Sequence, residues 1–413
     1  MIRQSDTGLN QFIMDTALQV LSGTPATREQ AMQLTQIPDT DLHDLFFWAN
    51  KIKQKFVGPH VKFCSIVAGK VGACPEDCTY CSQSKLYQTH VTPDKMSVED
   101  MEEAAREAAK NGANAFGIVN SGRGPTDAEL DWMEPFFRNT SEGKNGKINP
   151  CATLGIATKE QAERLHDMGV KRINHNLETS RRQFHKVTST HSYQDRVDAI
   201  KTYKDAGMHI CAGGIFGMGE QWEDRIDMAI ELRDLKVDTV PVNFLYAIPG
   251  TKLHGTIEEL PPMECLKIIA IYRFLLHDAS IKLAGGREKI LRDTQALAFF
   301  CGASSFLIGN YLTTFGRTPQ ADHQLLKDLG LKYTDDTGNV YEPDPINATV
   351  LAPGADSAPG KPEMMSRRDG SIMALSVLNS GEMPKEPINR SAAGLAAAAA
   401  ASGQGIGGTG CCS

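Results

Sequence analysis

Three cysteines gather in the short segment ACPEDCTYCSQS, where Cys74, Cys78 and Cys81 have the spacing CxxxCxxC. Thiolates are soft ligands that select zinc or iron–sulfur clusters. Structural zinc takes four protein ligands, usually as two closely spaced pairs, and no second pair follows here. Three thiolates can instead hold three irons of a cubane cluster and leave the fourth iron open to a substrate. The spacing therefore favours a site-differentiated iron–sulfur cluster over structural zinc.

Amide and carboxylate side chains recur in the segment INHNLETS, which contains Asn174, Asn176 and Glu178. Alternate residues of a strand point to one side, so we expect these three side chains to face the same way. Buried amides beside a carboxylate suit a ligand with hydroxyl and amide groups, such as a ribose or a urea. A structural belt of hydrogen bonds would use the same residues, and the pattern alone leaves both interpretations open.

Further cysteines fall within predicted strands, at Cys151 and Cys211. Each alone is typical of a buried core thiol, but on neighbouring inward-facing strands they become candidate ligands of a second cluster. Arg287, in the segment LAGGREK, would need an anionic partner if it is buried, and a cluster with thiolates is one such partner. Cys265 and Cys301 lie in helical segments and are interpreted as core residues.

These residues must be positioned by a repeating scaffold. Short apolar runs alternate with amphipathic segments, which is typical of βα units around a parallel sheet. Eight repeats of this kind predict an α/β fold, a TIM-type (β/α)8 barrel whose active site lies at the carboxyl ends of its strands. The predicted strands are Val61–Val67, Ala115–Asn120, Ile148–Thr153, Arg172–Asn176, His209–Ile215, Thr239–Leu245, Ile281–Leu283 and Ser304–Ile308.

Composition divides the chain into three parts. Residues 1–58 have apolar positions at helical spacing and predict a helical extension before the barrel, which is assigned to residues 59–343. Residues 344–413 are dominated by Pro, Gly, Ser and Ala, which predicts a flexible tail of low complexity.

Charge and cysteine usage exclude several classes of function. The 413-residue chain has a net charge of −7 and no basic stripe, which disfavours nucleic-acid binding. It has no export signal and no apolar run long enough to span a membrane. Clustered cysteines without these signals indicate metal ligands in a reducing, cytoplasmic location rather than a disulfide framework.

The CxxxCxxC segment after the first predicted strand resembles that of the radical S-adenosylmethionine (SAM) enzymes. The longer segments GACPEDCTYCSQS, INHNLETS, PVNFLYAIPGTKL and LAGGREKILRDTQA resemble the biotin synthases within that superfamily. The resemblance extends from about Val61 to Leu329. It implies sulfur insertion into dethiobiotin by a 5′-deoxyadenosyl radical, an electron donor such as flavodoxin or ferredoxin, and a homodimer.

The resemblance also implies roles for individual residues. Cys74, Cys78 and Cys81 would hold the 4Fe–4S cluster, and SAM would bind its open iron. Tyr80 would lie near the adenine. Asn176 and Glu178 match positions that contact the ribose of SAM, although the usual residue at the second position is aspartate.

Substrate and sulfur-donor positions follow from the same comparison. Asn174 and Asn243 match polar contacts to dethiobiotin. Cys151, Cys211 and Arg287 match three of the four ligands of an auxiliary 2Fe–2S cluster that donates sulfur.

The fourth auxiliary ligand is missing, because Gly117 stands where the family has a cysteine. We therefore expect an atypical member with a variant auxiliary cluster or without one. Cys64, on the first predicted strand, is one candidate replacement, and the tail pair Cys411–Cys412 is another. That pair could equally be exposed thiols without a role.

Two other functions stay open. A related radical SAM enzyme, such as a methylornithine synthase or a hydrogenase maturase, would explain the missing cysteine but not the asparagines and Arg287. A non-catalytic iron–sulfur protein would not need a polar barrel mouth.

Overall fold

The structure is a computed structural model and describes residues 4–314 and 316–344. Eight parallel strands within these residues form a closed barrel, since the last barrel strand pairs with the first at Lys62–Ser305. All eight predicted strands are confirmed. In barrel order they are β1 (Lys62–Val71), β3 (Ala115–Asn120), β4 (Asn149–Thr153), β5 (Arg172–Asn174), β6 (His209–Cys211), β8 (Thr239–Phe244), β9 (Ser280–Leu283) and β10 (Ser305–Leu307).

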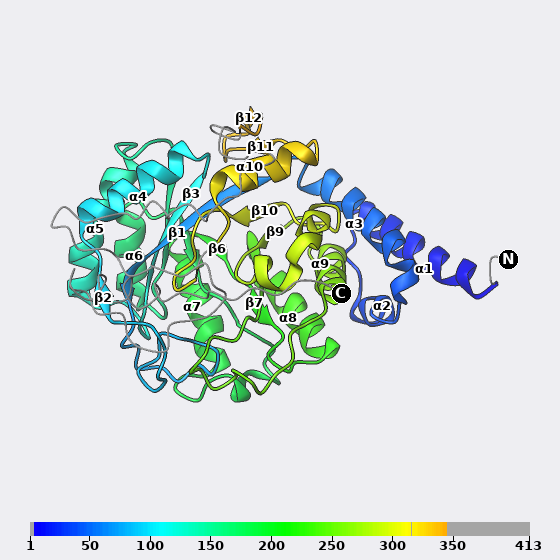
Figure 1. The fold of residues 1–413 in the computed structure, drawn as a ribbon, viewed down its shortest axis with the longest axis horizontal. Coiled ribbons are helices and arrows are strands. Elements are labelled where there is room, and N and C mark those ends of the chain that lie inside the picture. Colours follow the sequence, from blue (N-terminus) through cyan, green and yellow to red (C-terminus); the bar gives the residue numbers. More distant parts are fainter. Residues whose placement is uncertain (1–3, 315, 345–413) are drawn as a thin grey trace, which may run out of the picture.

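Helices surround the barrel and connect successive strands (Figure 1). Several begin with a capping box; Thr158 and Gln161 cap one helix reciprocally, and Ser192 and Asp195 cap another. The surrounding helices are α4 (Val98–Lys110), α5 (Asp127–Ser141), α6 (Lys159–Asp167), α7 (Tyr193–Asp205), α8 (Trp222–Asp234), α9 (Pro262–Leu275) and α10 (Pro319–Asp328).

The predicted N-terminal helices are present as α1 (Gln4–Leu21), α2 (Arg28–Leu34) and α3 (Leu42–Phe56). They pack on α8 and α9, on one side of the barrel (Figure 1). The division of the chain into three domains stays a prediction. The predicted tail lies outside the described residues from position 345 onward.

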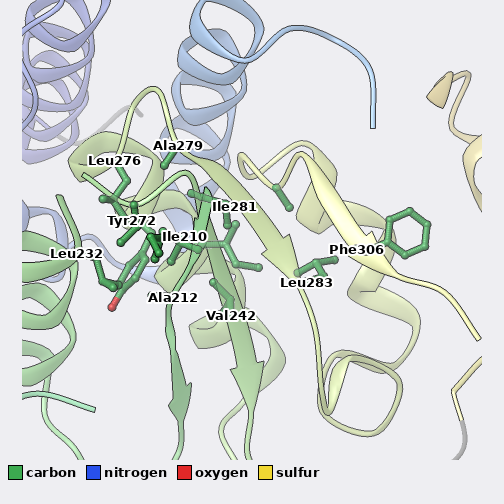
Figure 2. Close-up of a cluster of buried hydrophobic side chains, with 14 of the residues drawn as sticks. Ile210, Ala212, Leu232, Val242, Tyr272, Leu276, Ala279, Ile281, Leu283 and Phe306 are labelled. Carbon is green, nitrogen blue, oxygen red and sulfur yellow. The ribbon is translucent and has the colours of Figure 1, made fainter. Parts of the chain in front are cut away.

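Strand alternation separates the outer core from the barrel interior. Figure 2 shows Ile210, Ala212, Val242 and Ile281 beside Leu232 and Tyr272 of the outer helices, with Leu283 further along β9. The residues between them on the same strands therefore point inward, because successive strand residues face opposite sides. This parity directs Cys211 and Lys282 into the lumen, by which we mean the interior of the barrel.

One predicted strand is interrupted. His209–Ile215 divides into β6 and a short β7 (Gly214–Phe216), which pairs with β8. Gly213 lies at the break, and a Cβ there would stand 2.0 Å from the carbonyl oxygen of Pro241. Only glycine permits this close approach of two backbones.

A small hairpin lies at the amino ends of the barrel strands. The strands β11 (Tyr333–Thr334) and β12 (Val340–Tyr341) pair with each other, and Val61 just before β1 bridges to Tyr333. Phe63 and Tyr333 stack with ring centroids 4.8 Å apart. The hairpin therefore lies at the amino ends of the barrel strands, which we call the floor of the barrel.

Candidate active site

The CxxxCxxC segment forms a loop after β1, at the carboxyl end of the barrel as predicted. We call it the cysteine loop. Its two branches are joined by hydrogen bonds from Cys74 N to Gln83 O (3.0 Å) and from Lys85 N to Cys74 O (2.9 Å). A third bond, from Cys81 N to Cys78 O (3.0 Å), forms a tight turn between the last two cysteines. The three thiols are thus gathered on one folded loop.

Acidic residues within the cysteine loop tie it to the segment that follows β5. Asp77 accepts hydrogen bonds from Ser189 N (2.9 Å) and from the hydroxyls of Thr188 (2.6 Å) and Ser189 (2.5 Å). Burial raises the pKa of Asp77, but these hydrogen bonds outweigh it and hold the pKa below its ordinary value. The carboxylate is therefore ionised and fixes the loop in place.

Two thiols of the cysteine loop, Cys78 and Cys81, are poor candidates for free thiolates. Burial raises the pKa of Cys78 to about 12 and that of Cys81 to about 11. A bound cation reverses this effect by stabilising the thiolate form. All the cysteines in the described part of the chain are free of disulfides, so the three are available as ligands.

No three His, Cys, Asp or Glu side chains in residues 4–314 and 316–344 are close enough together to hold a single metal ion. A cubane cluster makes a different demand, since each cysteine binds a different iron. The spacing and burial of the loop fit such a cluster.

The polar residues after β5 differ in part from the predicted arrangement. The strand ends at Asn174, so simple alternation does not extend to Asn176 and Glu178. The amide oxygen of Asn176 accepts a hydrogen bond from Gly213 N (3.2 Å). Glu178 has a positive φ of 70°, which is uncommon for a residue other than glycine.

Glu178 also has an unused oxygen. Its Oε1 accepts a hydrogen bond from Arg196 (3.2 Å), whereas its Oε2 is buried and has no partner among the described residues. A buried carboxylate oxygen without a donor is costly, and a ligand hydroxyl would supply one. This observation fits the predicted contact to a ribose.

Asn243 lies at the end of β8, and both ends of its amide are engaged. Its Nδ2 donates to Gly214 O (3.0 Å), and its Oδ1 accepts from Gly285 N (2.9 Å). One N–H and one lone pair remain for a ligand. The side chain therefore joins the ends of two strands in addition to any contact with substrate.

A chain of buried polar groups connects the cysteine loop with Glu178. Glu76 Oε2 lies 2.5 Å from Nδ1 of His191, and the Nε2 of that histidine accepts a hydrogen bond from Arg196 Nε (3.0 Å). Arg196 also donates to Asn176 O (2.8 Å). Burial and Arg196 lower the pKa of His191, so the ring is neutral with its proton on Nδ1.

Arg196 and His191 were not predicted from the sequence. For Arg196 the available signal was its place among the buried residues of α7. A basic residue on a helix usually points into the solvent instead.

A second group of thiols lies deeper, inside the lumen. Cys64 on β1 and Cys151 on β4 share a small buried cluster with Ala115, Ala284 and Leu307. Cys211 on β6 is 1% exposed, and strand parity directs it to the same interior. We call Cys64, Cys151 and Cys211 the lumen thiols.

Gly117 lies beside this group, on β3 and opposite Cys151 in the strand register. A Cβ built on Gly117 would stand 3.8 Å from the Cβ of Cys151 and 3.3 Å from a methyl group of Ile66. A cysteine at this position would therefore enter the lumen beside Cys151. The strand β3 pairs with β4 along one edge and with β1 along the other, and Cys64 is buried near the start of β1.

Two cations lie beside the lumen thiols, one buried and one half-buried, and neither was predicted. Lys282 on β9 is 7% exposed, and its Nζ lies 3.9 Å from Cys64 Sγ. Burial lowers the pKa of Lys282, but Cys211 and Cys64 raise it overall. Arg172 is the register partner of Cys151. Burial lowers the pKa of Arg172, but Cys151 and Cys64 raise it overall.

The structure corrects the prediction for Arg287. Its guanidinium is buried, but it donates to Asp322 (2.7 Å), Gln295 (2.7 Å) and the carbonyl oxygen of Leu307 (3.2 Å). The anion that it requires is therefore a carboxylate of α10 and not a cluster. The cations beside the lumen thiols are instead Arg172 and Lys282, which lies on the strand before Arg287.

The remaining predicted residues are the tyrosine of the cysteine loop, two helical cysteines and the two cysteines of the tail. Tyr80 is half-buried, and burial together with Glu178 raises its pKa. Cys265 and Cys301 are fully buried, as predicted for core residues. Cys411 and Cys412 lie outside the described residues. None of the helices within these residues is long and apolar enough to cross a membrane.

Two family models match the chain. The Radical SAM superfamily matches residues 70–232, which contain the cysteine loop and Glu178. The Biotin and Thiamin Synthesis associated domain matches residues 241–332, which contain Asn243 and Lys282.

Similar curated proteins extend over most of the chain. The biotin synthase of Citrifermentans bemidjiense is 43% identical over 326 residues, which cover 78% of this chain and 98% of that protein. The biotin synthase of Heliobacterium modesticaldum is 44% identical over 324 residues, with the same coverage of 78% and 98%.

Solved structures show a similar fold at much lower identity. The crystal structure of a methylornithine synthase has a TM-score of 0.68 and 16% identity, and the match covers 78% of this chain and 98% of that one. An FeFe-hydrogenase maturase from Carboxydothermus hydrogenoformans has a TM-score of 0.67 and 18% identity, with coverage of 78% and 79%. These matches concern the fold alone.

Proposed function

The chain belongs to the biotin synthase family of radical SAM enzymes, and from this premise we propose which residues carry out its reaction. The protein catalyses the radical SAM-dependent insertion of sulfur into dethiobiotin to form biotin. Its cofactors include a 4Fe–4S cluster and SAM. When bound, they supply the radical chemistry that breaks unactivated C–H bonds, which acid–base groups cannot do.

The cysteine loop is the proposed site of the 4Fe–4S cluster, with Cys74, Cys78 and Cys81 as ligands. The bonds from Ser189 and Thr188 to Asp77 support this role, because they fix the loop before any cofactor binds. Glu178 is the proposed partner of a ribose hydroxyl through its unused Oε2.

Four more residues complete the proposed mouth of the site. Tyr80 would pack near the adenine of SAM, and Asn176 would align its ribose. Asn174 and Asn243 are the proposed contacts to the ureido group of dethiobiotin, because amides can both donate to and accept from a urea. An enclosing barrel supports radical chemistry by keeping water and other hydrogen donors away.

The sulfur donor is the proposed departure from the family pattern. We assign its protein ligands to the lumen thiols Cys64, Cys151 and Cys211, with Lys282 as a cation beside them. The observation that carries this proposal is the contact of 3.9 Å between Lys282 Nζ and Cys64 Sγ, together with the shared cluster of Cys64 and Cys151. An auxiliary iron–sulfur cluster, 2Fe–2S or a variant, would place thiolates beside two cations, Lys282 and Arg172.

Three further features are proposed from the family. Flavodoxin or ferredoxin would donate electrons, two copies of the chain would associate, and the location would be cytoplasmic. The fold is shared with methylornithine synthase and a hydrogenase maturase, but identities of 16% and 18% do not extend their activities to this chain.

The first test compares Cys64→Ser with Cys265→Ser, which alters a buried thiol far from the lumen in α9. Both variants are reconstituted anaerobically with iron and sulfide and studied by Mössbauer spectroscopy. We expect Cys64→Ser to lose the second cluster and to form biotin more than about 100-fold slower, since even outer partners of metal ligands are worth about 10- to 100-fold. SAM cleavage should persist.

Cys265→Ser should keep both clusters and biotin formation. If Cys64→Ser retains the second cluster with unchanged Mössbauer parameters, Cys64 is not a ligand and the assignment is wrong.

A further inference from the structure

One carboxylate on the floor of the barrel contacts the beginnings of several strands. Asp336, in the turn of the β11–β12 hairpin, accepts hydrogen bonds from Lys62 (2.8 Å), Asn114 (3.0 Å) and Asn149 (2.8 Å). Its Oδ2 also lies 3.7 Å from Nη2 of Arg172. A single side chain thus joins β1, β3, β4 and β5 at their amino ends.

The turn that carries this carboxylate is internally braced. The neighbouring Asp335 accepts hydrogen bonds from Thr337 N (2.9 Å) and Asn339 N (2.9 Å), and from the Tyr341 hydroxyl (3.0 Å). The hairpin is joined to β1 by the bond from Thr334 N to Val61 O (2.9 Å). Asp336 is therefore held in a fixed position below the lumen.

Arg172 lies between this carboxylate and the lumen thiols. It is the register partner of Cys151. Burial lowers the pKa of Arg172, but Cys151, Cys64 and Asp336 lie close enough that their ionised forms raise it overall. Its Nε is buried and has no hydrogen-bond partner within the part of the chain that the structure describes. Burying a guanidinium with an unused donor is costly unless a further acceptor completes the site.

We propose that Arg172, held from below by Asp336, is a positioning residue that offsets the negative charge of the cluster at the lumen thiols and sets its reduction potential. This inference rests on the proposed auxiliary cluster. A cluster with thiolate ligands becomes more negative on reduction, and in a buried site a nearby cation stabilises the reduced form more than the oxidised form. The unused Nε–H is available to a sulfur acceptor.

Substitutions of Arg172 and Asp336 should shift the reduction potential of the auxiliary cluster in opposite directions. Arg172→Met removes a positive charge, so the auxiliary cluster should become harder to reduce. Asp336→Asn removes a negative charge from below the same guanidinium, so the cluster should become easier to reduce. We expect each change to alter the one-electron reduction constant by at least tenfold, which corresponds to about 59 mV.

The experiment is an anaerobic redox titration of the reconstituted full chain, followed by electron paramagnetic resonance and Mössbauer spectra. The 4Fe–4S cluster of the cysteine loop serves as an internal reference whose potential should stay constant. Arg172→Lys keeps the charge and should restore most of the shift seen with Arg172→Met. Lys62→Met also removes a partner of Asp336, but Lys62 is exposed at the surface, where charges are screened, so its shift should stay below about threefold.

Opposite shifts in Arg172→Met and Asp336→Asn would support the inference, because general loosening of the floor would move both potentials in the same direction. Shifts of equal sign, or no shift in either variant, would overturn it. If Arg172→Met does not fold, Asp336→Asn still decides the sign, since the inference requires the cluster of that variant to become easier to reduce. A wild-type chain without any second cluster in its Mössbauer spectrum would instead refute the proposed auxiliary site itself.

Discussion

At the scale of single residues, the site depends on charges placed beside thiols. The cysteine loop is fixed by Asp77 and linked through Glu76, His191 and Arg196 to the oxygen of Glu178. Buried charges of this kind are stable only as hydrogen-bonded networks, since removing one member leaves the others unpaired. Small changes within the network should therefore affect cofactor binding before they affect the fold.

Asp77→Asn tests this expectation. The variant keeps the shape of the side chain but loses the charge that accepts hydrogen bonds from Thr188 and Ser189. Hydrogen bonds to charged groups contribute about 1.5–3 kcal/mol each, so we expect at least about tenfold faster loss of iron from the cysteine loop. Transfer of iron to a chelator, followed by absorbance, measures the rate.

The matched control is Asp234→Asn, in which the carboxylate is 70% exposed at the end of α8. Its rate of iron loss should equal that of the wild type. Equal rates of iron loss in Asp77→Asn and the wild type would show that the hydrogen bonds to Asp77 do not hold the cysteine loop.

At the scale of elements, α3 introduces a buried lysine into its contact with the barrel. Lys53 is 2% exposed and donates to the carbonyl oxygen of Phe299 (2.7 Å). Burial lowers the pKa of Lys53 from its ordinary value of 10.5 to about 8, and the charge of Arg273 adds to this effect. The packing of the N-terminal helices should therefore depend on pH.

The direction follows from proton linkage. Between pH 8 and 10.5 the unfolded chain keeps the proton on Lys53 while the folded chain loses it, so the free energy of unfolding should rise with pH. The rise can reach about 3 kcal/mol. Urea denaturation of the wild type and of Lys53→Met at several pH values measures the difference between the two slopes.

Lys51→Met, on the exposed side of the same helix, should leave the slope of the wild type unchanged. If the free energy of unfolding changes with pH in the same way in the wild type and in Lys53→Met, Lys53 is not neutral in the folded protein.

At the scale of the whole molecule, periodicity predicted the barrel because every strand is a short apolar run between amphipathic helices. Its closure through Lys62 and Ser305 follows from the number of repeats. The cysteine loop could also be predicted, since its ligands are close in sequence.

The long-range partners of charged residues could not be predicted. Arg287 finds its anion in Asp322, on a helix that the sequence gives no reason to place beside it. Lys282 and Arg172 are basic residues in predicted strands, and only the barrel shows that they face the lumen thiols. Contacts of this kind depend on the closed fold and leave no local pattern.

The whole chain also offers a test of the tail cysteines. If the lumen thiols hold the auxiliary cluster, Cys411→Ser/Cys412→Ser in the full chain should retain both clusters and form biotin at the rate of the wild type. Iron and sulfide analysis with Mössbauer spectroscopy measures the clusters. Loss of the second cluster in this double variant, with retention in Cys64→Ser, would move the assignment to the tail pair.

The position of Asp336 late in the chain has a consequence for folding during synthesis on the ribosome. Asp336 joins partners that precede it by 274, 222 and 187 residues. Translation proceeds at about 5–20 residues per second, so the first strands wait many seconds for this contact. The last barrel strand, β10, ends at Leu307, so this contact forms only after all eight strands have been synthesised.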